Sequence, residues 1–132
     1  MIPTSSEEAI RMGLRDIEDK FGICFVKIAD GEAESKAPLL SKHRNFYNVP
    51  YGAVLFNIAD NTAGMAYLSA GGNGVTVSGN VNYLRGAAPE AESVRCRAKV
   101  IKRGRKLCFI EAEVEDDHGN LLSTYSFVYS DI

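Results

Sequence analysis

The segment between residues 49 and 69 constrains the fold most, because its apolar residues cover most of the circumference of a helix. A surface helix carries one apolar stripe, whereas a helix that is apolar nearly all round must be buried. We therefore predict a long central helix at Val49–Ser69, with Asn48 as its cap and Pro50 in its first turn. The apolar positions are Val54, Leu55, Ile58, Ala59, Ala63, Met65, Ala66 and Leu68.

The flanking sequence predicts one more helix and an antiparallel sheet. Apolar residues at helical spacing indicate an N-terminal helix that Ser5 or Ser6 caps and Gly22 ends. The Asp30-Gly31 turn favours a pair of strands at 23–29 and 32–39. Alternating residues predict strands at 75–83, 93–101 and 107–115, and a last strand at 121–129 follows the turn at 117–120. The late strands are joined by short turns that leave no room for crossover helices, so they should pair antiparallel. An α+β fold follows, in which a single sheet wraps the central helix.

Length, charge and cysteine usage limit the other possibilities. The 132 residues contain no linker or repeat, which predicts one domain: an N-terminal helix at 1–21 and a core at 22–132. A net charge of -2 gives no electrostatic reason to expect nucleic acid as a partner. With no signal-peptide core and no apolar run of membrane-spanning length, we expect a cytoplasmic protein without a membrane partner. Cys24, Cys96 and Cys108 lie among apolar residues and are expected to be buried free thiols.

One line of polar residues interrupts the apolar helix. Asn57, Asp60, Asn61 and Gly64 recur at steps of three and four residues, which places them on one face. A carboxylate in the middle of an apolar helix is costly to bury unless it is hydrogen-bonded or protonated. Desolvation also makes a carboxylate more basic, which suits a general base or a nucleophile. Alternatively, this face reaches solvent or bonds a neighbouring subunit, and the periodicity alone does not separate these possibilities.

The start of the same helix carries a second chemical feature. Gly52 leaves the backbone open to close approach, and the first N–H groups of a helix have no intrahelical partners and can polarise a carbonyl. Asp60 lies about 12 Å further along a straight helix. One reacting carbonyl is therefore not expected to meet both groups of one subunit. A dimer with antiparallel helices would place Gly52 of one chain opposite Asp60 of the other.

The segment from Asn45 to Asp60 resembles the signature of PaaI-like hotdog acyl-CoA thioesterases, which is Asn, five residues, His-Gly-Gly, six residues and Asp. Asn45, Gly52 and Asp60 match this spacing without a gap, whereas the histidine is Tyr51 here and the second glycine is Ala53. The stretches 74–85, 102–106 and 116–119 are similar to later motifs of the family. The resemblance thus extends from about residue 20 to about residue 130.

The resemblance implies a hotdog fold, a homodimer as the minimal active unit, further assembly into a homotetramer, and hydrolysis of an acyl-CoA to the free acid and coenzyme A. It implies that Asp60 attacks the thioester carbonyl or activates water, while the Gly52 N–H of the partner chain polarises that carbonyl. Asn45 would orient water or substrate, and Thr76 would supply a helping hydroxyl. Neither a metal nor a cofactor is expected.

Candidate substrate-binding residues lie around this signature. Arg103 and Arg105 belong to a basic turn that could bind the phosphates of coenzyme A, with Arg85 assisting, although a merely solvated turn is equally consistent with the sequence. The other candidate substrate-binding residues are Tyr51, which replaces the histidine of the signature, and Asn61, which follows Asp60. Loop aromatics such as Tyr51 either line an acyl pocket or pack over the core.

Two other functions on the same fold are weighed against hydrolysis. A non-catalytic acyl-CoA-binding module would bind without turnover, and the departures at Tyr51 and Ala53 are compatible with it. A hydratase or dehydratase would need a histidine near the start of the helix, and His43 lies too far upstream to match.

Overall fold

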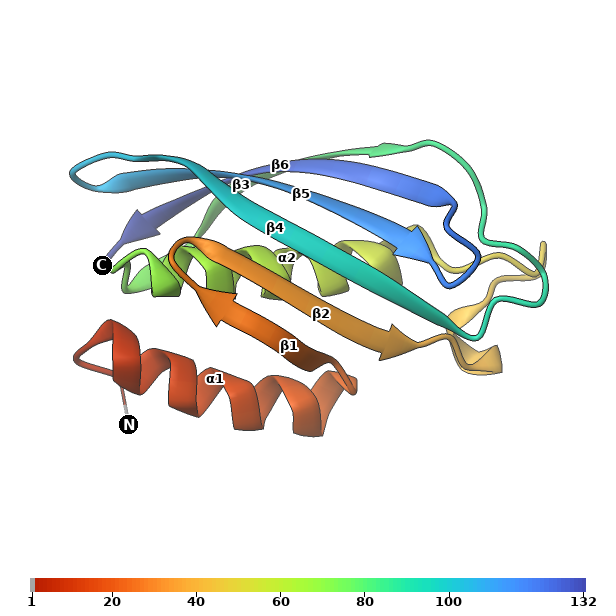
Figure 1. Ribbon diagram of the computed structural model, residues 1–132, viewed down its shortest axis with the longest axis horizontal. Helices are drawn as coiled ribbons and strands as arrows, with labels where there is room; N and C mark the ends of the chain where they lie inside the picture. The colour runs from red at the N-terminus through yellow and green to blue at the C-terminus, as the bar shows by residue number, and fades with distance from the viewer. Residues whose placement is uncertain (1) are drawn as a thin grey trace.

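The computed structural model describes residues 2–132 and contains one antiparallel sheet and two α-helices over that range (Figure 1). The elements are α1 (Ser6–Phe21), β1 (Cys24–Ala29), β2 (Glu32–Pro38), the 3-10 turn η1 (Ser41–His43), α2 (Gly52–Ser69), β3 (Gly74–Tyr83), β4 (Ser93–Arg103), β5 (Leu107–Asp116) and β6 (Leu121–Asp131). The strand order is β1-β2-β4-β5-β6-β3, so β1 and β3 are the edges of the sheet.

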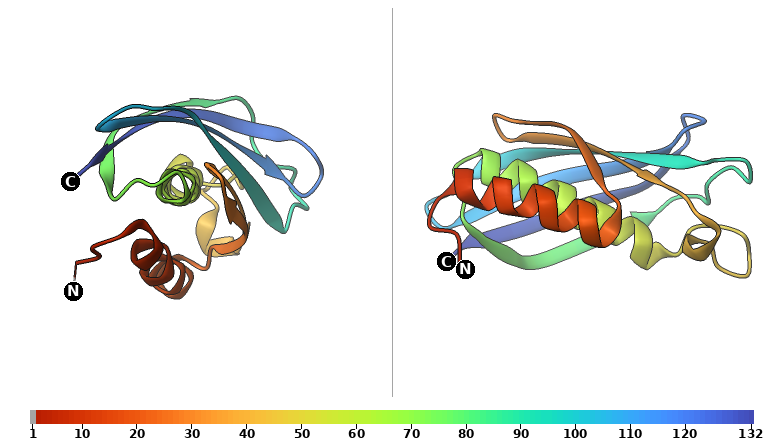
Figure 2. Two further views of the ribbon diagram at one scale, coloured as in Figure 1. Left: turned by 60° about the vertical axis from the view of Figure 1, so that its left-hand side comes forward. Right: turned by 90° about the horizontal axis from the view of Figure 1, so that it is seen from below.

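The sheet curves around α2 and α1 lies on its open side, as the end-on view shows (Figure 2). Residues on α2 pack against the inner face of the sheet and form one buried core with it. Burying each large apolar side chain contributes roughly 1.5–3 kcal/mol, so this contact holds the fold together. The predicted α+β hotdog fold with a wrapped central helix is confirmed. Its fully buried side chains include Ile23, Met65, Tyr67, Val94, Ile110, Val114, Leu122 and Phe127.

Local signals explain the bounds of α1. The Ser5 hydroxyl accepts a hydrogen bond from Glu8 N at 3.1 Å, and Gly22 ends the helix in the left-handed conformation at φ 68°. Of the two predicted caps, Ser5 is therefore the one used. The Ser6 hydroxyl instead donates to Gly72 O at 2.6 Å, which ties the start of α1 to the end of α2.

The predicted start of α2 is wrong by one turn. The helix begins at Gly52 with Tyr51 as its cap residue, so Asn48 and Pro50 lie before it. Asn48 takes a left-handed conformation at φ 61°, which is incompatible with a cap in extended conformation. The side chain of Asn45 accepts hydrogen bonds from Tyr47 N and Val49 N and folds the preceding segment into a loop. The local turn thus outcompetes the capping signal.

Two of the three cysteines match the prediction of buried thiols and one does not. Cys96 and Cys108 are buried, and burial raises the pKa of the Cys96 thiol to about 12, which makes it unreactive at neutral pH. Cys24 is exposed, because it opens the edge strand β1 and its Sγ points towards Glu18 of α1.

The edge strand β3 exposes most of its length. Val75 and Val77 are 54% and 55% exposed, and the register against β6 shifts between Thr76 and Ser78. At Gly79 a side chain would meet the Phe127 and Phe56 rings at 2.9 Å. A long strand edge with exposed valines is a surface that another strand can pair with. Within residues 2–132, no helix is long and apolar enough to cross a membrane.

Candidate active site

The carboxylate of Asp60 is held by two hydroxyl groups from different strands. Thr76 Oγ1, on β3, donates to Asp60 Oδ1 at 2.8 Å, and Tyr129 OH, on β6, donates to the same oxygen at 2.7 Å. The Tyr129 hydroxyl also lies 2.5 Å from the main-chain oxygen of Asp60. Within residues 2–132, no hydrogen bond is made to Oδ2. One carboxylate oxygen is thus fixed while the other is available for chemistry.

Tyr129 is the residue of this site that the sequence reasoning missed. Its side chain is 5% exposed, and its pKa is raised, first by burial and then by the negative charge of Asp60. The phenol therefore stays protonated at neutral pH and acts as a donor. The signal for it was present in the alternation of β6, which points Tyr125, Phe127 and Tyr129 inward.

A hollow of about 260 Å³ opens beside Asp60, and we call it the α1–α2 hollow. It brings together three of the predicted site residues, Asp60, Asn61 and Thr76, and adds Tyr129. The Asn61 amide donates to the main-chain and side-chain oxygens of Asn57, both at 2.9 Å. The other lining residues are Gly13, Ile17, Gly64, Met65, Tyr67, Leu68, Gly74 and Val75.

Gly52 lies at the other end of the polar face, where α2 begins. As the first helical residue it has no carbonyl within the helix to accept its N–H. Its carbonyl accepts a hydrogen bond from Tyr83 OH at 2.8 Å, and a Cβ at Gly52 would lie 2.8 Å from the Tyr83 ring. A side chain at residue 52 would therefore force the helix start and the Tyr83 ring apart. Gly52 is about 12 Å from Asp60 along the helix axis.

The loop before α2 holds Asn45 and Tyr51, the residue that stands in place of the signature's histidine. Asn45 uses its side-chain oxygen to shape the loop, and Tyr51 donates its N–H to His43 O at 2.9 Å. The Tyr51 side chain is 47% exposed. Phe46 and Tyr47 contact each other with ring centroids 4.4 Å apart and are 86% and 74% exposed, so they do not cover the core.

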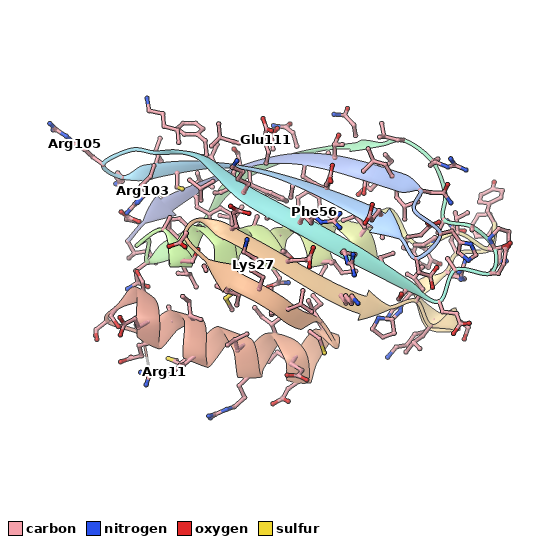
Figure 3. The ribbon with its side chains drawn as sticks, in the orientation of Figure 1. Arg11, Lys27, Phe56, Arg103, Arg105 and Glu111 are labelled. Atoms are coloured by element: carbon pink, nitrogen blue, oxygen red, sulfur yellow. The ribbon has the colours of Figure 1, made fainter. Side chains whose placement is uncertain are left out.

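The predicted phosphate-binding arginines lie in different surroundings. Arg103 Nη2 pairs with Asp131 at 2.7 Å, and Asp131 also accepts a hydrogen bond from Tyr67. Arg105 extends from the tip of the turn between β4 and β5 (Figure 3). The Arg85 N–H bonds Leu122 O at the start of β6, at the opposite end of the strand from Asp131. Within one chain, Arg85 therefore does not join the other two.

The sequence of the chain matches the profile of a known family. The profile of the Thioesterase superfamily matches residues 47–123, a range that includes the segment around Gly52, Asp60 and Thr76. The chain belongs to the Thioesterase superfamily. The predicted resemblance to hotdog thioesterases is thereby confirmed.

Individual relatives are similar in fold over most of the chain. The PaaI protein of the phenylacetic acid degradation operon of E. coli has a TM-score of 0.85 at 17% identity and covers 96% of this chain and 91% of its own. A hypothetical thioesterase protein of Streptococcus pneumoniae, solved with coenzyme A, has a TM-score of 0.80 at 19% identity and covers 93% and 94%. An Archaeoglobus fulgidus protein whose name includes the word esterase is 26% identical over 98 residues, which are 74% of this chain and 63% of that relative.

Proposed function

We propose that the protein hydrolyses an acyl-CoA thioester to the free acid and coenzyme A. The observation that carries this proposal is the Asp60 carboxylate, which two hydroxyls hold by one oxygen at the mouth of a hollow. A carboxylate fixed in this way can activate a water molecule or attack a carbonyl with its free oxygen. Membership of the Thioesterase superfamily and the fold shared with a coenzyme A-bound thioesterase protein support the same reaction.

The complete site is proposed to form between two chains. Asp60 is bonded to Thr76 near the start of β3, whereas Gly52 is bonded to Tyr83 at its end. When two β3 edges pair antiparallel about a twofold axis, the start of each strand lies beside the end of the other. This pairing covers the open edge of β3 and brings the partner's helix start towards Asp60. The homodimer is therefore the minimal active unit, and its outer sheet faces remain available for assembly into a tetramer.

In the proposed reaction, Asp60 Oδ2 takes a proton from water as the water oxygen bonds to the thioester carbon. The C–S bond then breaks, the acid is released, and coenzyme A leaves as the thiolate, which takes up a proton. If Oδ2 attacks the carbonyl instead, the C–S bond breaks as coenzyme A leaves as the thiolate, and water then hydrolyses the mixed anhydride that remains on Asp60. In both routes the N–H of Gly52 from the second chain stabilises the oxyanion, since N–H groups at a helix start are unpaired and carry partial positive charge.

The nucleotide part of coenzyme A is proposed to lie towards the basic turn. Arg105 is exposed at the tip of this turn and free to bind a phosphate, whereas Arg103 already neutralises Asp131. The dimer pairing described above also moves Arg85 of the second chain towards the start of β3, where Asp131 pairs with Gly74. Three arginines from two chains then lie near one end of the site. Asn45 and Tyr51 belong to the loop at the helix start and would contact the substrate there.

The test is thiol release from a panel of acyl-CoA substrates by the wild-type protein and by Asp60→Asn. The variant keeps the shape of the side chain and removes the base, so kcat should fall by roughly a hundredfold or more. Asp19→Asn, on the exposed face of α1, is the matched control and should keep wild-type activity. An equally active Asp60→Asn would overturn the role of Asp60. Acyl-CoA binding without thiol release by the wild type would identify a non-catalytic binding module instead.

A further inference from the structure

The α1–α2 hollow has a polar end and an apolar end. Asp60, Thr76 and Tyr129 form the polar end. From there the hollow follows one face of α2 past Gly64 to Leu68, positions that are four residues apart and so lie in line. Two turns of helix separate Asp60 from Leu68, which is about 12 Å. The hollow thus has the shape of a slot that begins at the reactive carboxylate.

The N-terminal helix α1 forms one wall of the apolar end. Ile17 from α1 lies across from Met65 and Leu68 of α2, and Val75 of β3 adds a further apolar side chain. Such a surface favours a hydrocarbon group and offers it no charged partner. A volume of 260 Å³ corresponds to about nine water molecules, which is the space for an acyl group of roughly nine non-hydrogen atoms.

Gly13 keeps the slot open between the two helices. A Cβ at Gly13 would lie 2.5 Å from Met65 Cε, so any larger residue must push the methionine into the slot or enter it. Glycine in the middle of a helix costs about 1 kcal/mol relative to alanine. Residue 13 sits in the interior of α1 and forms no turn or cap, so the backbone does not require glycine there. The close approach of Met65 explains why residue 13 is a glycine.

We propose that the acyl group lies in the α1–α2 hollow and that Gly13 and Ile17 of α1 set the length of acyl chain that the enzyme accepts. Short and medium apolar acyl groups fit between α1 and α2, with the thioester carbonyl at Asp60, whereas a palmitoyl chain exceeds the slot. Coenzyme A then extends from Asp60 on the other side of α2, where the sheet carries the basic turn. The assignment of α1 as the specificity element rests on the proposed thioesterase function. It makes a claim about binding that can be tested separately from hydrolysis.

The experiment compares wild-type protein with Gly13→Leu and Ile17→Ala. Binding of non-hydrolysable thioether analogues of acetyl-, octanoyl- and palmitoyl-CoA is measured by titration calorimetry, and kcat/KM is measured for the matching thioesters. Gly13→Leu should weaken binding of the octanoyl analogue tenfold or more and leave the acetyl analogue unchanged. Ile17→Ala should lengthen the accepted chain and improve the palmitoyl analogue relative to octanoyl. Arg15→Leu, on the exposed face of α1, adds the same side chain outside the hollow and should keep the wild-type profile.

The binding data separate the claim that the hollow holds the acyl group from the claim that the protein hydrolyses the thioester. A selective loss of octanoyl binding in Gly13→Leu without any hydrolysis by the wild type would support the acyl slot and overturn the hydrolytic function. Hydrolysis with the same chain-length preference in all three variants would support the function and overturn the slot. The slot would also be overturned if the wild-type protein bound neither the octanoyl nor the palmitoyl analogue more tightly than the acetyl analogue.

Discussion

The hydroxyl of Tyr129 lies 2.7 Å from Asp60 Oδ1, and it reaches this oxygen from the opposite side of the core, 69 residues later in the chain. Gly64 makes this approach possible, since a Cβ there would lie only 3.1 Å from the hydroxyl. The phenol is buried and protonated, so it keeps one carboxylate oxygen occupied and sets the direction of the other. Tyr129 is therefore a positioning residue for Asp60.

Replacing Tyr129 by Phe should lower kcat by roughly ten- to a hundredfold, because a hydrogen bond to a charged group contributes about 1.5–3 kcal/mol. KM should stay near the wild-type value, since the phenol orients the carboxylate and leaves binding of the substrate unchanged. Steady-state kinetics on an accepted acyl-CoA gives both constants, and thermal unfolding checks the fold. Tyr47→Phe removes an exposed hydroxyl and serves as the control. A rise in KM alone would contradict the positioning role.

Gly52→Ala should reduce kcat/KM by at least tenfold, because the new methyl group would lie 2.8 Å from the Tyr83 ring and displace the helix start. In a Gly52→Ala/Tyr83→Ala double variant the methyl group has room, so part of the activity should return. The double-mutant cycle measures this coupling directly. Independent, additive losses would show that the contact between these two residues does not hold the helix start in place.

Val77→Lys should convert the proposed homodimer to monomers and abolish hydrolysis, because it places a charge on the exposed edge strand β3. Ile101→Lys is the matched control, since Ile101 is equally exposed at 55% but lies on β4, an interior strand of the sheet. Sedimentation velocity reports the assembly state, and thiol release reports activity. An active monomer would refute the two-chain site.

Asp116 should make the fold sensitive to acid. Burial alone would raise the pKa of its carboxyl, but hydrogen bonds from Ala88, His118 and Asn120 outweigh that effect and lower the pKa from 3.8 to about 2. Because the folded-state pKa lies below the unfolded one, the stabilisation is present above about pH 4 and is lost as the pH falls towards 2. The shift corresponds to about 2 kcal/mol.

Asp116→Asn should therefore lower the free energy of unfolding by about 2 kcal/mol at neutral pH, and the difference from wild type should shrink between pH 4 and pH 2. Urea titrations over this range measure the effect, and Asp19→Asn should follow the wild-type curve. A difference that does not change with pH would show that the carboxylate charge is not what stabilises the turn.

The architecture could be predicted from the sequence because its signals are local. The apolar circumference of the central helix identified the buried element, and a serine cap and Gly22 marked the ends of α1. Turn residues and residue alternation together located the six strands. The start of α2 was misplaced because Asn48-Val49-Pro50 resembles a capped helix start, whereas the side chain of Asn45 folds the same residues into a loop.

The site could be predicted only in part. The spacing of Gly52 and Asp60 follows from one helix, so a sequence pattern can capture it. The contacts of Tyr129 and Tyr83 depend on how β6 and β3 pass over that helix, and strand register is set by the whole sheet. The pairing of Arg103 with Asp131 could not be predicted either, because the two residues are 28 positions apart and only the sheet brings them together.

The position of α1 outside the sheet has a consequence for how such a protein can diversify. Changes on α1 alter the space above α2 without disturbing a single ladder hydrogen bond or the hydroxyls around Asp60. If the proposed roles hold, the reacting groups and the helix that sets the accepted acyl length are carried by separate segments of the chain. Substitutions on this one surface helix could then change the preferred acyl-chain length without altering the groups around Asp60.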